Sequence, residues 1–293
     1  MHVIETEHLT KDYGKGRGVF DVSFAVKQGE VFGFLGPNGA GKTTTIRQLM
    51  GFVKPGGGTA RIQGKDCFRE REQIQKKLGY LPGETAFMDE MKGEEFIRLI
   101  GRLKGIHDFS RAEELIRQFE LDPSGRIGRM SKGTRQKIGI VCAFMQRPEI
   151  LILDEPTSGL DPLMQNRFIE LLLEEKEKGT TIFLSSHIFE EIERTCDRTA
   201  FIRNGRIIAV EQMEHMRKNR RKIYEITLEE EQEAQKFAGK FPGAACSGRC
   251  VTVETAELGR LIQELARTKV TDLKTRSQSL EELFLSYYGG GKA

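Results

Sequence analysis

The most constraining feature of this chain is the glycine-rich turn Gly36-Pro-Asn-Gly-Ala-Gly-Lys-Thr43, which fits the pattern G-x-x-x-x-G-K-[ST]. An apolar run at 30–35 predicts a buried strand before the turn, and a helix should begin near Gly41. In such a turn backbone N–H groups point at phosphate oxygens, and the helix N-terminus adds positive partial charge. Lys42 places its charge on the β- and γ-phosphates, and the Thr43 hydroxyl can reach Mg²⁺. The motif therefore predicts a nucleotide site.

Two further apolar runs end in polar residues that suit chemistry on a phosphate. The run at 150–153 predicts a buried strand followed by two acids, of which Asp154 is expected to hold Mg²⁺. Glu155 is a candidate to polarise the attacking water. The run at 181–184 leads to His187, which is placed to contact the γ-phosphate, although a histidine there can also be purely structural. The predicted cofactor-binding residues of the glycine-rich turn are Gly36, Pro37, Asn38, Gly39, Ala40, Gly41, Lys42, Thr43 and Thr44.

The pattern of elements predicts an α/β domain with a mainly parallel sheet. Near-continuous apolar strands alternate with helical patterns, as parallel sheets covered on both faces require. One helix is predicted over 93–104, with Phe96, Leu99, Ile100 and Leu103 on one face. The next is predicted to start at a capping box, Ser110-Arg-Ala-Glu113.

Composition shifts near residue 215. The basic stretch 216–222 predicts a solvated linker between a domain over 1–215 and a small accessory domain over 223–293. Within the latter the pattern predicts strands at 223–228, 249–254 and 270–275, helices at 230–238 and 256–267, and a weak strand near Ala244. This order approximates a split βαβ domain. A second capping box, Ser279-Leu-Glu-Glu282, predicts a final helix.

Composition narrows the class of protein. A net charge of +3 over 293 residues argues against a dedicated nucleic-acid binder, so no nucleic-acid partner is expected. The apolar runs are strand-length, far short of the roughly 20 residues that a spanning helix needs. The first residues lack the features of a signal peptide. The five cysteines are scattered, which suits reduced thiols. Cys246 and Cys250 could pair or share a metal, but no second ligand pair of zinc-site spacing accompanies them.

Two more motifs complete a recognisable set. Met130-Ser-Lys-Gly-Thr-Arg-Gln136 precedes an apolar helix, and Pro156-Thr-Ser-Gly-Leu-Asp161 follows the two acids. Together with the glycine-rich turn, the acids and His187, these motifs resemble the nucleotide-binding subunit of ABC transporters over residues 1–215. The resemblance implies a P-loop ABC ATPase fold with a parallel core, an antiparallel β subdomain and a helical subdomain at about 85–145. It also implies that the chain binds ATP with Mg²⁺ and hydrolyses it.

The resemblance implies further roles. Tyr13, in Lys11-Asp-Tyr-Gly14, matches the aromatic that stacks on adenine, although a lone turn tyrosine says little by itself. Ser131 and Gly133 match the signature motif, which caps the γ-phosphate bound to the opposite subunit. The functional unit is therefore expected to be a homodimer, or a heterodimer with a related ATPase. Asp161 falls at the dimer-contact loop. Lys42, Glu155 and His187 match the catalytic set, and Thr43 and Asp154 the metal set.

The chain also departs from the family pattern. Lys132 and Thr134 replace the usual second glycine and the glutamine of the signature, which resembles the ABC-2 exporter branch. Gly83, followed by Glu84, stands where the family has a glutamine close to Mg²⁺. Whether Glu84 replaces that ligand stays open.

The ABC-2 resemblance implies an ATPase that drives a separate polytopic permease from the cytoplasmic face of the membrane. Two alternatives stay open at this point. One is a soluble ABC ATPase acting on ribosomes or DNA, although such proteins usually carry two cassettes or an inserted coiled coil. The other is a subunit that uses ATP only to dimerise. Nothing in the sequence identifies a cargo.

Overall fold

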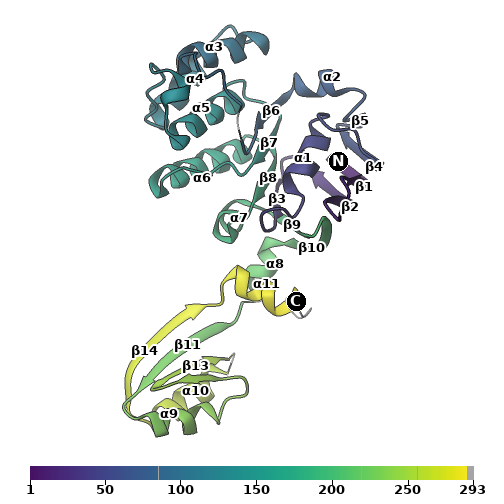
Figure 1. Ribbon diagram of the computed structural model, residues 1–293. Coiled ribbons are helices and arrows are strands. Elements are labelled where there is room, and N and C mark those ends of the chain that lie inside the picture. Colours follow the sequence, from purple (N-terminus) through teal and green to yellow (C-terminus); the bar gives the residue numbers. More distant parts are fainter. Residues whose placement is uncertain (85, 219, 256, 289–293) are drawn as a thin grey trace. The chain divides into compact units, whose positions relative to one another are not determined.

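The computed structural model describes residues 1–84, 86–218, 220–255 and 257–288 (Figure 1). The described chain forms two compact units, Met1–Met213 and the residues from Glu214 onward. No helix of these described ranges is long and apolar enough to cross a bilayer. Some predicted features extend onto residues outside the described ranges, namely the start of the helical subdomain at Thr85, part of the linker at Asn219, a helix start at Ala256, and 289–293.

A six-stranded sheet forms the centre of the first unit. Its strands, in spatial order, are β10 (Arg206–Gln212), β9 (Arg198–Arg203), β3 (Val31–Leu35), β8 (Thr181–Ser186), β7 (Ile150–Asp154) and β6 (Leu78–Leu81). All adjacent pairs are parallel except β9 with β10. Every residue of β3, β7 and β8 is buried, because helices and a second sheet cover the two faces. The carboxyl ends of β3, β8, β7 and β6 therefore lie side by side at one edge.

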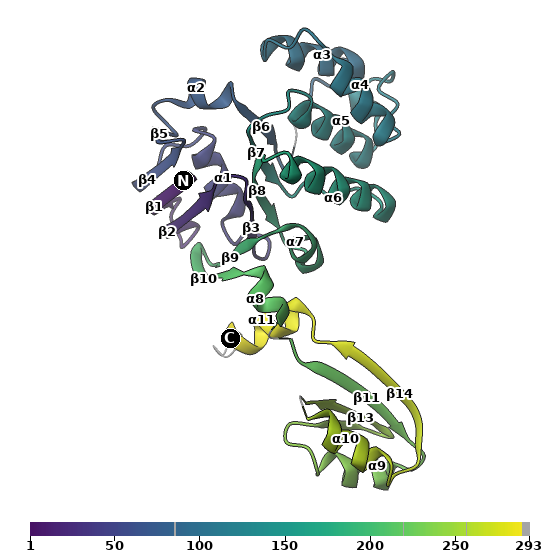
Figure 2. The same cartoon turned by 180° about the vertical axis from the view of Figure 1, so that it is seen from behind.

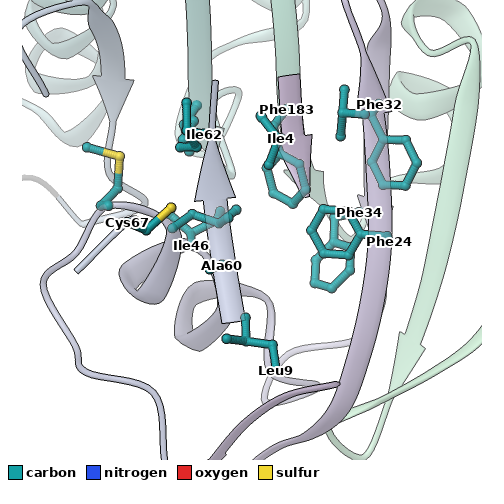
Figure 3. Packing of buried hydrophobic residues seen from close by; sticks show 14 of the residues in the cluster. Ile4, Leu9, Phe24, Phe32, Phe34, Ile46, Ala60, Ile62, Cys67 and Phe183 are labelled. Carbon is teal, nitrogen blue, oxygen red and sulfur yellow. The ribbon is translucent and has the colours of Figure 1, made fainter. Parts of the chain in front are cut away.

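The second sheet of this unit is antiparallel. It has the order β2 (Gly18–Lys27), β1 (His2–Asp12), β4 (Gly57–Ile62) and β5 (Lys65–Asp66). Helix α1 (Lys42–Leu49) contacts strands of both sheets. The core between them is rich in aromatic rings, and Figure 3 shows Phe24, Phe34 and Phe183 packed together beside Phe32. The rings of Phe24 and Phe32 stack with centroids 5.3 Å apart. This packing fixes the strand that leads into the glycine-rich turn.

The remaining helices of the first unit follow the predicted alternation. Figures 1 and 2 show α3, α4 and α5 grouped together, on the far side of the central sheet from β1 and β2. The bounds are α2 (Arg71–Gln75), α3 (Gly93–Leu103), α4 (Ser110–Gln118), α5 (Lys132–Phe144), α6 (Pro162–Glu177) and α7 (Phe189–Thr195), with a 3₁₀ turn at Ile127–Arg129. The predicted α/β fold class, with its antiparallel β and helical parts, is confirmed.

The apolar face predicted for α3 is wrong at one end. Leu103 is 75% exposed, whereas Phe96, Ile97 and Gly101 are buried. The reason is a close packing that hydropathy does not reveal, since a Cβ on Gly101 would lie 2.4 Å from the Phe109 ring. The glycine lets that ring approach the backbone, and the buried face turns toward it.

The first predicted capping box is also wrong. Ser110 is already inside α4, and its N–H and hydroxyl both donate to the Asp108 carboxylate, at 2.9 and 3.0 Å. Two hydrogen bonds to a charged acceptor replace the single bond that the serine would have accepted from Glu113. The second capping box is confirmed, because Ser279 and Glu282 exchange backbone-to-side-chain bonds of 2.8 and 3.0 Å at the start of α11 (Leu280–Tyr288).

The second unit is a four-stranded antiparallel sheet with two helices. The strands lie in the order β12 (Ala245–Ser247), β13 (Cys250–Glu254), β11 (Lys222–Leu228) and β14 (Val270–Ser277). Helices α9 (Glu231–Ala238) and α10 (Leu258–Leu265) connect them, and the core includes Ile226, Phe237, Val251 and Leu261. Sequence order and sheet order together confirm the predicted split βαβ arrangement.

The basic stretch predicted as a linker is structured over much of its length. It is helical up to Lys218 as part of α8 (Met213–Lys218), and β11 begins at Lys222. The start of α8 is fixed because Met213 N donates to the Asp197 carbonyl at 2.9 Å and Thr199 Oγ1 to Met213 Sδ at 3.2 Å. The division into an ATPase domain over 1–215 and an accessory domain over 223–293 stays a prediction.

Candidate nucleotide-binding site

A cavity of about 760 Å³ opens at the carboxyl ends of the central strands of the first unit, the edge where α/β sheets bind ligands. Gly36, Pro37 and Ala40 belong to the glycine-rich turn but do not line the cavity, and neither do Ser131 and Gly133. The predicted site residues that line it are Tyr13, Asn38, Gly39, Gly41, Lys42, Thr43, Thr44, Asp154, Glu155 and His187.

The shape of the turn depends on its glycines and on Lys42. Gly41, the residue before α1, has φ 111°, and a Cβ there would lie 2.6 Å from Val19 Cγ1. Gly39 has φ 79°, in the same left-handed region that residues with a Cβ rarely adopt. Lys42 Nζ folds back to donate to the Gly36 and Pro37 carbonyls, at 2.7 and 3.1 Å. Lys42, the residue expected to contact phosphate, therefore hydrogen-bonds the backbone of the turn itself.

Three charged or ionisable side chains lie close together beside the carboxyl ends of β7 and β8. Lys42 Nζ lies 3.0 Å from Glu155 Oε1, and His187 Nδ1 hydrogen-bonds Glu155 Oε2. A carboxylate can only accept, so the ring nitrogen donates. The glutamate is one-fifth exposed and the histidine nearly half exposed, so both reach the cavity. A base held by an orienting partner is the arrangement that activates a nucleophile such as water.

The backbone at Glu155 is unusual for its residue type. Its φ is 49°, a left-handed conformation that costs free energy for any residue with a Cβ. The conformation is held by Ser185, whose carbonyl and hydroxyl both accept from Glu155 N, at 3.1 and 3.2 Å. Backbone strain of this kind concentrates at functional sites. It turns Glu155 away from the strand direction of Asp154 and toward Lys42.

Asp154 is 1% exposed and lies at the end of β7. Its carboxylate accepts hydrogen bonds from the hydroxyls of Ser185 and Thr43. Burial raises the pKa of Asp154 above its ordinary value, and those two hydrogen bonds partly oppose the rise. A hydroxyl oxygen and a carboxylate are hard oxygen donors, and Mg²⁺ typically takes one or two carboxylates and completes its shell with water and phosphate. Thr43 and Asp154 therefore fit this metal.

Gly83 lies beside Asp154, where the family pattern has a glutamine. A Cβ at Gly83 would be 3.3 Å from Asp154 Oδ2, so the position adjoins the carboxylate expected to hold Mg²⁺. Glycine supplies no ligand there. Glu84, the next residue, is exposed and lines the same cavity.

The signature residues lie against the loop that follows Glu155. Ser131 is the N-cap of α5, and its hydroxyl accepts from Thr134 N at 3.1 Å. A Cβ on Gly133 would come within 2.6 Å of the Gly159 carbonyl, and Lys132 Nζ donates to Ser158 Oγ at 2.8 Å. The start of α5 and the loop after Glu155 are thus in direct contact within one chain.

Two predicted residues lie nearer the rim. Tyr13 is 49% exposed and lines the cavity, with Lys11 Nζ 5.7 Å from its ring centroid. Asp161 caps α6, since its carboxylate accepts from Met164 N at 3.0 Å.

Several neighbours of the site were not predicted from the sequence. Arg47 and Tyr80 line the cavity, and burial together with the charge of Asp154 raises the pKa of Tyr80 to about 12. Ser185 holds both acids, and Ser186 donates to the buried Glu191 carboxylate. Burial raises the pKa of Glu191 to about 7. The pair of serines at the end of β8 was a visible signal, because parallel strands deliver their C-terminal side chains to one edge.

Comparison with known proteins agrees with the family resemblance drawn from the sequence motifs. Residues 19–158 match the family model described as "ABC transporter". The chain is 37% identical to the bacitracin transport ATP-binding protein BcrA of Bacillus licheniformis over 79% of this chain and 77% of that protein. It is 31% identical to the protein of the same name from Enterococcus faecalis, over 99% and 97%. A solved ATP-binding subunit of an ABC transporter superposes with a TM-score of 0.67 at 35% identity, covering 74% of this chain and 92% of that one.

The similarity to BcrA of Enterococcus faecalis runs through both units, and the glycine-rich turn, the paired acids and the histidine of the first unit line one cavity. The chain belongs to the ATP-binding proteins of ABC transporters, ATPases whose hydrolysis of ATP is coupled to transport.

Proposed function

We propose that this chain is the ATPase subunit of an ABC-2 type exporter, in which two cassettes close on two Mg-ATP molecules and drive separate membrane subunits. The observation that carries the site assignment is the meeting of Lys42 and His187 on opposite oxygens of Glu155. Export is supported by the similarity to two bacitracin transport proteins and by Lys132 and Thr134 in the signature motif.

In the proposed mechanism the turn Gly36–Thr43 holds the phosphates with its backbone N–H groups and the N-terminus of α1. Lys42 turns from Glu155 and the turn carbonyls to the β- and γ-phosphates, where its charge is neutralised by the ligand. Glu155, released from the lysine, accepts a proton from the attacking water, while His187 holds the carboxylate in place. Tyr13 stacks on the adenine, and its exposed ring leaves a face for that contact.

Thr43 and Asp154 would hold Mg²⁺, with the buried carboxylate supplying the negative charge. The metal supplies Lewis-acid stabilisation of phosphate charge. Because Gly83 has no side chain that could bind the metal, Asp154 is the one carboxylate that we assign as a ligand of Mg²⁺. Glu84 is exposed and lines the same cavity.

Ser131 and Gly133 would bind the γ-phosphate held by the other cassette. A serine and a glycine N–H at a helix start make an anion site. Neither residue lines this chain's own cavity, although Lys132 between them does, and this supports a role toward a neighbour. Lys132 and Ser158 connect that helix start to the loop after Glu155. Binding of the neighbour's ATP is thereby coupled to the chain's own general base.

The partner in this proposal is a polytopic permease, and the chain lies at the cytoplasmic face of the membrane through it. Purification of the tagged chain from gently solubilised membranes tests this. A polytopic membrane protein in near-equal amount is expected, with bacitracin as the first cargo to try on the pair. Recovery with ribosomal proteins or DNA, and with no membrane protein, would replace this reading by the soluble alternative, which the two bacitracin transport relatives do not favour.

A further inference from the structure

Strand β14 forms one edge of the sheet in the second unit and is long and exposed. Seven of its eight residues are exposed, and no described strand pairs with its outer side. The opposite edge, β12, is only three residues long. An edge strand offers a row of unpaired N–H and C=O groups to another strand, and natural proteins commonly shorten such edges. β12 follows that rule and β14 does not.

The register of β14 decides which backbone groups face outward. Gln278 N donates to the Arg221 carbonyl at 2.9 Å, so the backbone groups of Gln278 point toward β11. Pairing is regular between Ser277 and Asp272. Successive residues of an antiparallel strand point their N–H and C=O in opposite directions. Leu273 and Thr275 therefore direct both groups away from the sheet, where a second strand can bond them.

The sequence of β14 is complementary to itself about Leu273. If two copies pair antiparallel with Leu273 opposite Leu273, then Asp272 of each strand lies opposite Lys274 of the other. Because Leu273 forms the hydrogen-bonded pair, the two Asp272–Lys274 pairs occupy the non-hydrogen-bonded positions, where side chains lie closest. Within one strand Lys274 Nζ lies 3.6 Å from Asp272 Oδ2, and the two side chains are still 73% and 53% exposed, so each can also face the partner strand.

Other registers lose this match. Centring the pair on Thr275 would place Lys274 opposite Arg276, two like charges that oppose pairing. Centring it on Thr271 would leave Asp272 opposite Val270. The charge pattern therefore favours one two-fold arrangement.

Exposed apolar side chains lie on the face of the sheet that carries α10. Leu273 is 48% exposed and pairs with the core residue Ile226, so it points to the helical face of the sheet. Leu258 and Ile262, one turn apart on α10, are 44% and 55% exposed. The crossover from β13 to β14 carries α10 over this side of the sheet. A two-fold axis perpendicular to the sheet places the α10 helices of both copies on the same face of the continuous sheet.

We propose that β14 pairs with β14 of a second copy of this chain, centred on Leu273, to form one continuous eight-stranded sheet without any need for nucleotide. This interface lies wholly in the second unit and is separate from the ATP-dependent closure proposed for the first. If the proposed function holds as well, the interface keeps two cassettes at a high effective concentration, since a linked pair closes intramolecularly.

The test uses the full chain without nucleotide and with EDTA, by sedimentation velocity up to about 100 μM, where a contact of micromolar affinity is largely formed. The unchanged chain is expected to dimerise. Asp272→Lys alone and Lys274→Asp alone each put like charges opposite each other twice, and each should be at least tenfold weaker in dimerisation. Both positions are exposed, so the fold should be retained.

Two further samples make the register falsifiable. An equimolar mixture of Asp272→Lys and Lys274→Asp chains restores opposite charges at both pairs, and the double variant Asp272→Lys/Lys274→Asp does so within one chain. Both should dimerise like the unchanged chain. Ala245→Lys on β12 adds a positive charge to the opposite edge and should leave dimerisation unchanged.

A monomeric unchanged chain at the highest concentration would overturn the proposal. So would single variants that still dimerise, or a mixture that stays monomeric. ATP hydrolysis, measured on the same protein preparations in a separate assay with Mg²⁺ and ATP and without EDTA, reports on the nucleotide site, because β14 does not line its cavity. Hydrolysis without dimerisation would therefore contradict the proposed interface alone. Dimerisation without hydrolysis would contradict the ATPase assignment alone.

Discussion

Lys42 Nζ lies 3.0 Å from Glu155 Oε1, so the cation expected to bind phosphate is paired with the carboxylate expected to activate water. The lysine is 5% exposed, and its other two bonds go to the carbonyls of Gly36 and Pro37. Phosphate and Glu155 therefore compete for one ammonium group. Phosphate binding would release the carboxylate as it delivers the bond to be cleaved, which couples substrate binding to base activation.

Glu155→Gln should lower the rate of ATP hydrolysis by about 10²-fold or more, because general-base catalysis is typically worth that much. ATP binding should be retained or tightened, because the amide no longer competes as an anion for Lys42. Phosphate release and equilibrium binding of ATP measure the two effects. The matched control is Glu190→Gln, an exposed residue of α7, which should leave both unchanged. Undiminished hydrolysis in Glu155→Gln would remove this residue from its role.

Tyr13→Ala should weaken ATP binding by about tenfold, since base–aromatic stacking contributes roughly 1–3 kcal/mol. Tyr13→Phe keeps the ring and should bind nearly as well as the unchanged chain. Titration with a fluorescent ATP analogue gives both dissociation constants. Equal weakening in the two variants would show that the hydroxyl, rather than the ring face, makes the contact.

Gly41→Ala should destabilise the fold and abolish ATP binding. The substitution combines a φ of 111° with a Cβ placed 2.6 Å from Val19 Cγ1, and we expect a loss of about 3 kcal/mol. Gly64→Ala is the control, because its φ of 76° is also left-handed but nothing lies within 4 Å of the added Cβ. That control should lose about 1 kcal/mol, the cost of the backbone conformation alone. Urea unfolding compares the two, and equal losses would contradict the steric argument.

Glu191→Gln should stabilise the chain at pH 8 far more than at pH 5. Burial raises the pKa of Glu191 from 4.5 to about 7 in the folded chain, with a hydrogen bond from Ser186 acting against the rise. Between these two values the folded state binds more protons than the unfolded state, so the free energy of unfolding falls as pH rises. The shift corresponds to about 3 kcal/mol in the free energy of unfolding. This stabilisation is fully present below pH 4.5 and is lost above pH 7.

Urea midpoints at the two pH values measure this effect. Glu190→Gln, one residue away and exposed, serves as the control and should shift the two midpoints equally. A Glu191→Gln variant whose advantage is the same at pH 5 and pH 8 would exclude a charged, buried carboxylate as the cause.

The strand ends were predictable because local pattern and chain direction determine them. A buried run before the glycine-rich turn and another before Asp154 imply parallel strands, and parallel strands deliver their ends to one edge. The cap of α4 and the buried face of α3 were not predictable from pattern. Each depends on a contact from a neighbouring segment, Asp108 in one and the Phe109 ring against Gly101 in the other.

The residues proposed for phosphate chemistry could be identified from the sequence, because the glycines, the lysine, the two carboxylates and the histidine stand at motif spacing. The tertiary structure alone decided how they are connected. The left-handed backbone of Glu155, its hydrogen bonds to Ser185 and its pairing with Lys42 join positions 30 or more residues apart. The same holds for β14, whose charge alternation is visible in the sequence. Its position at an open edge depends on the sheet order, which arises from long-range pairing that no local pattern specifies.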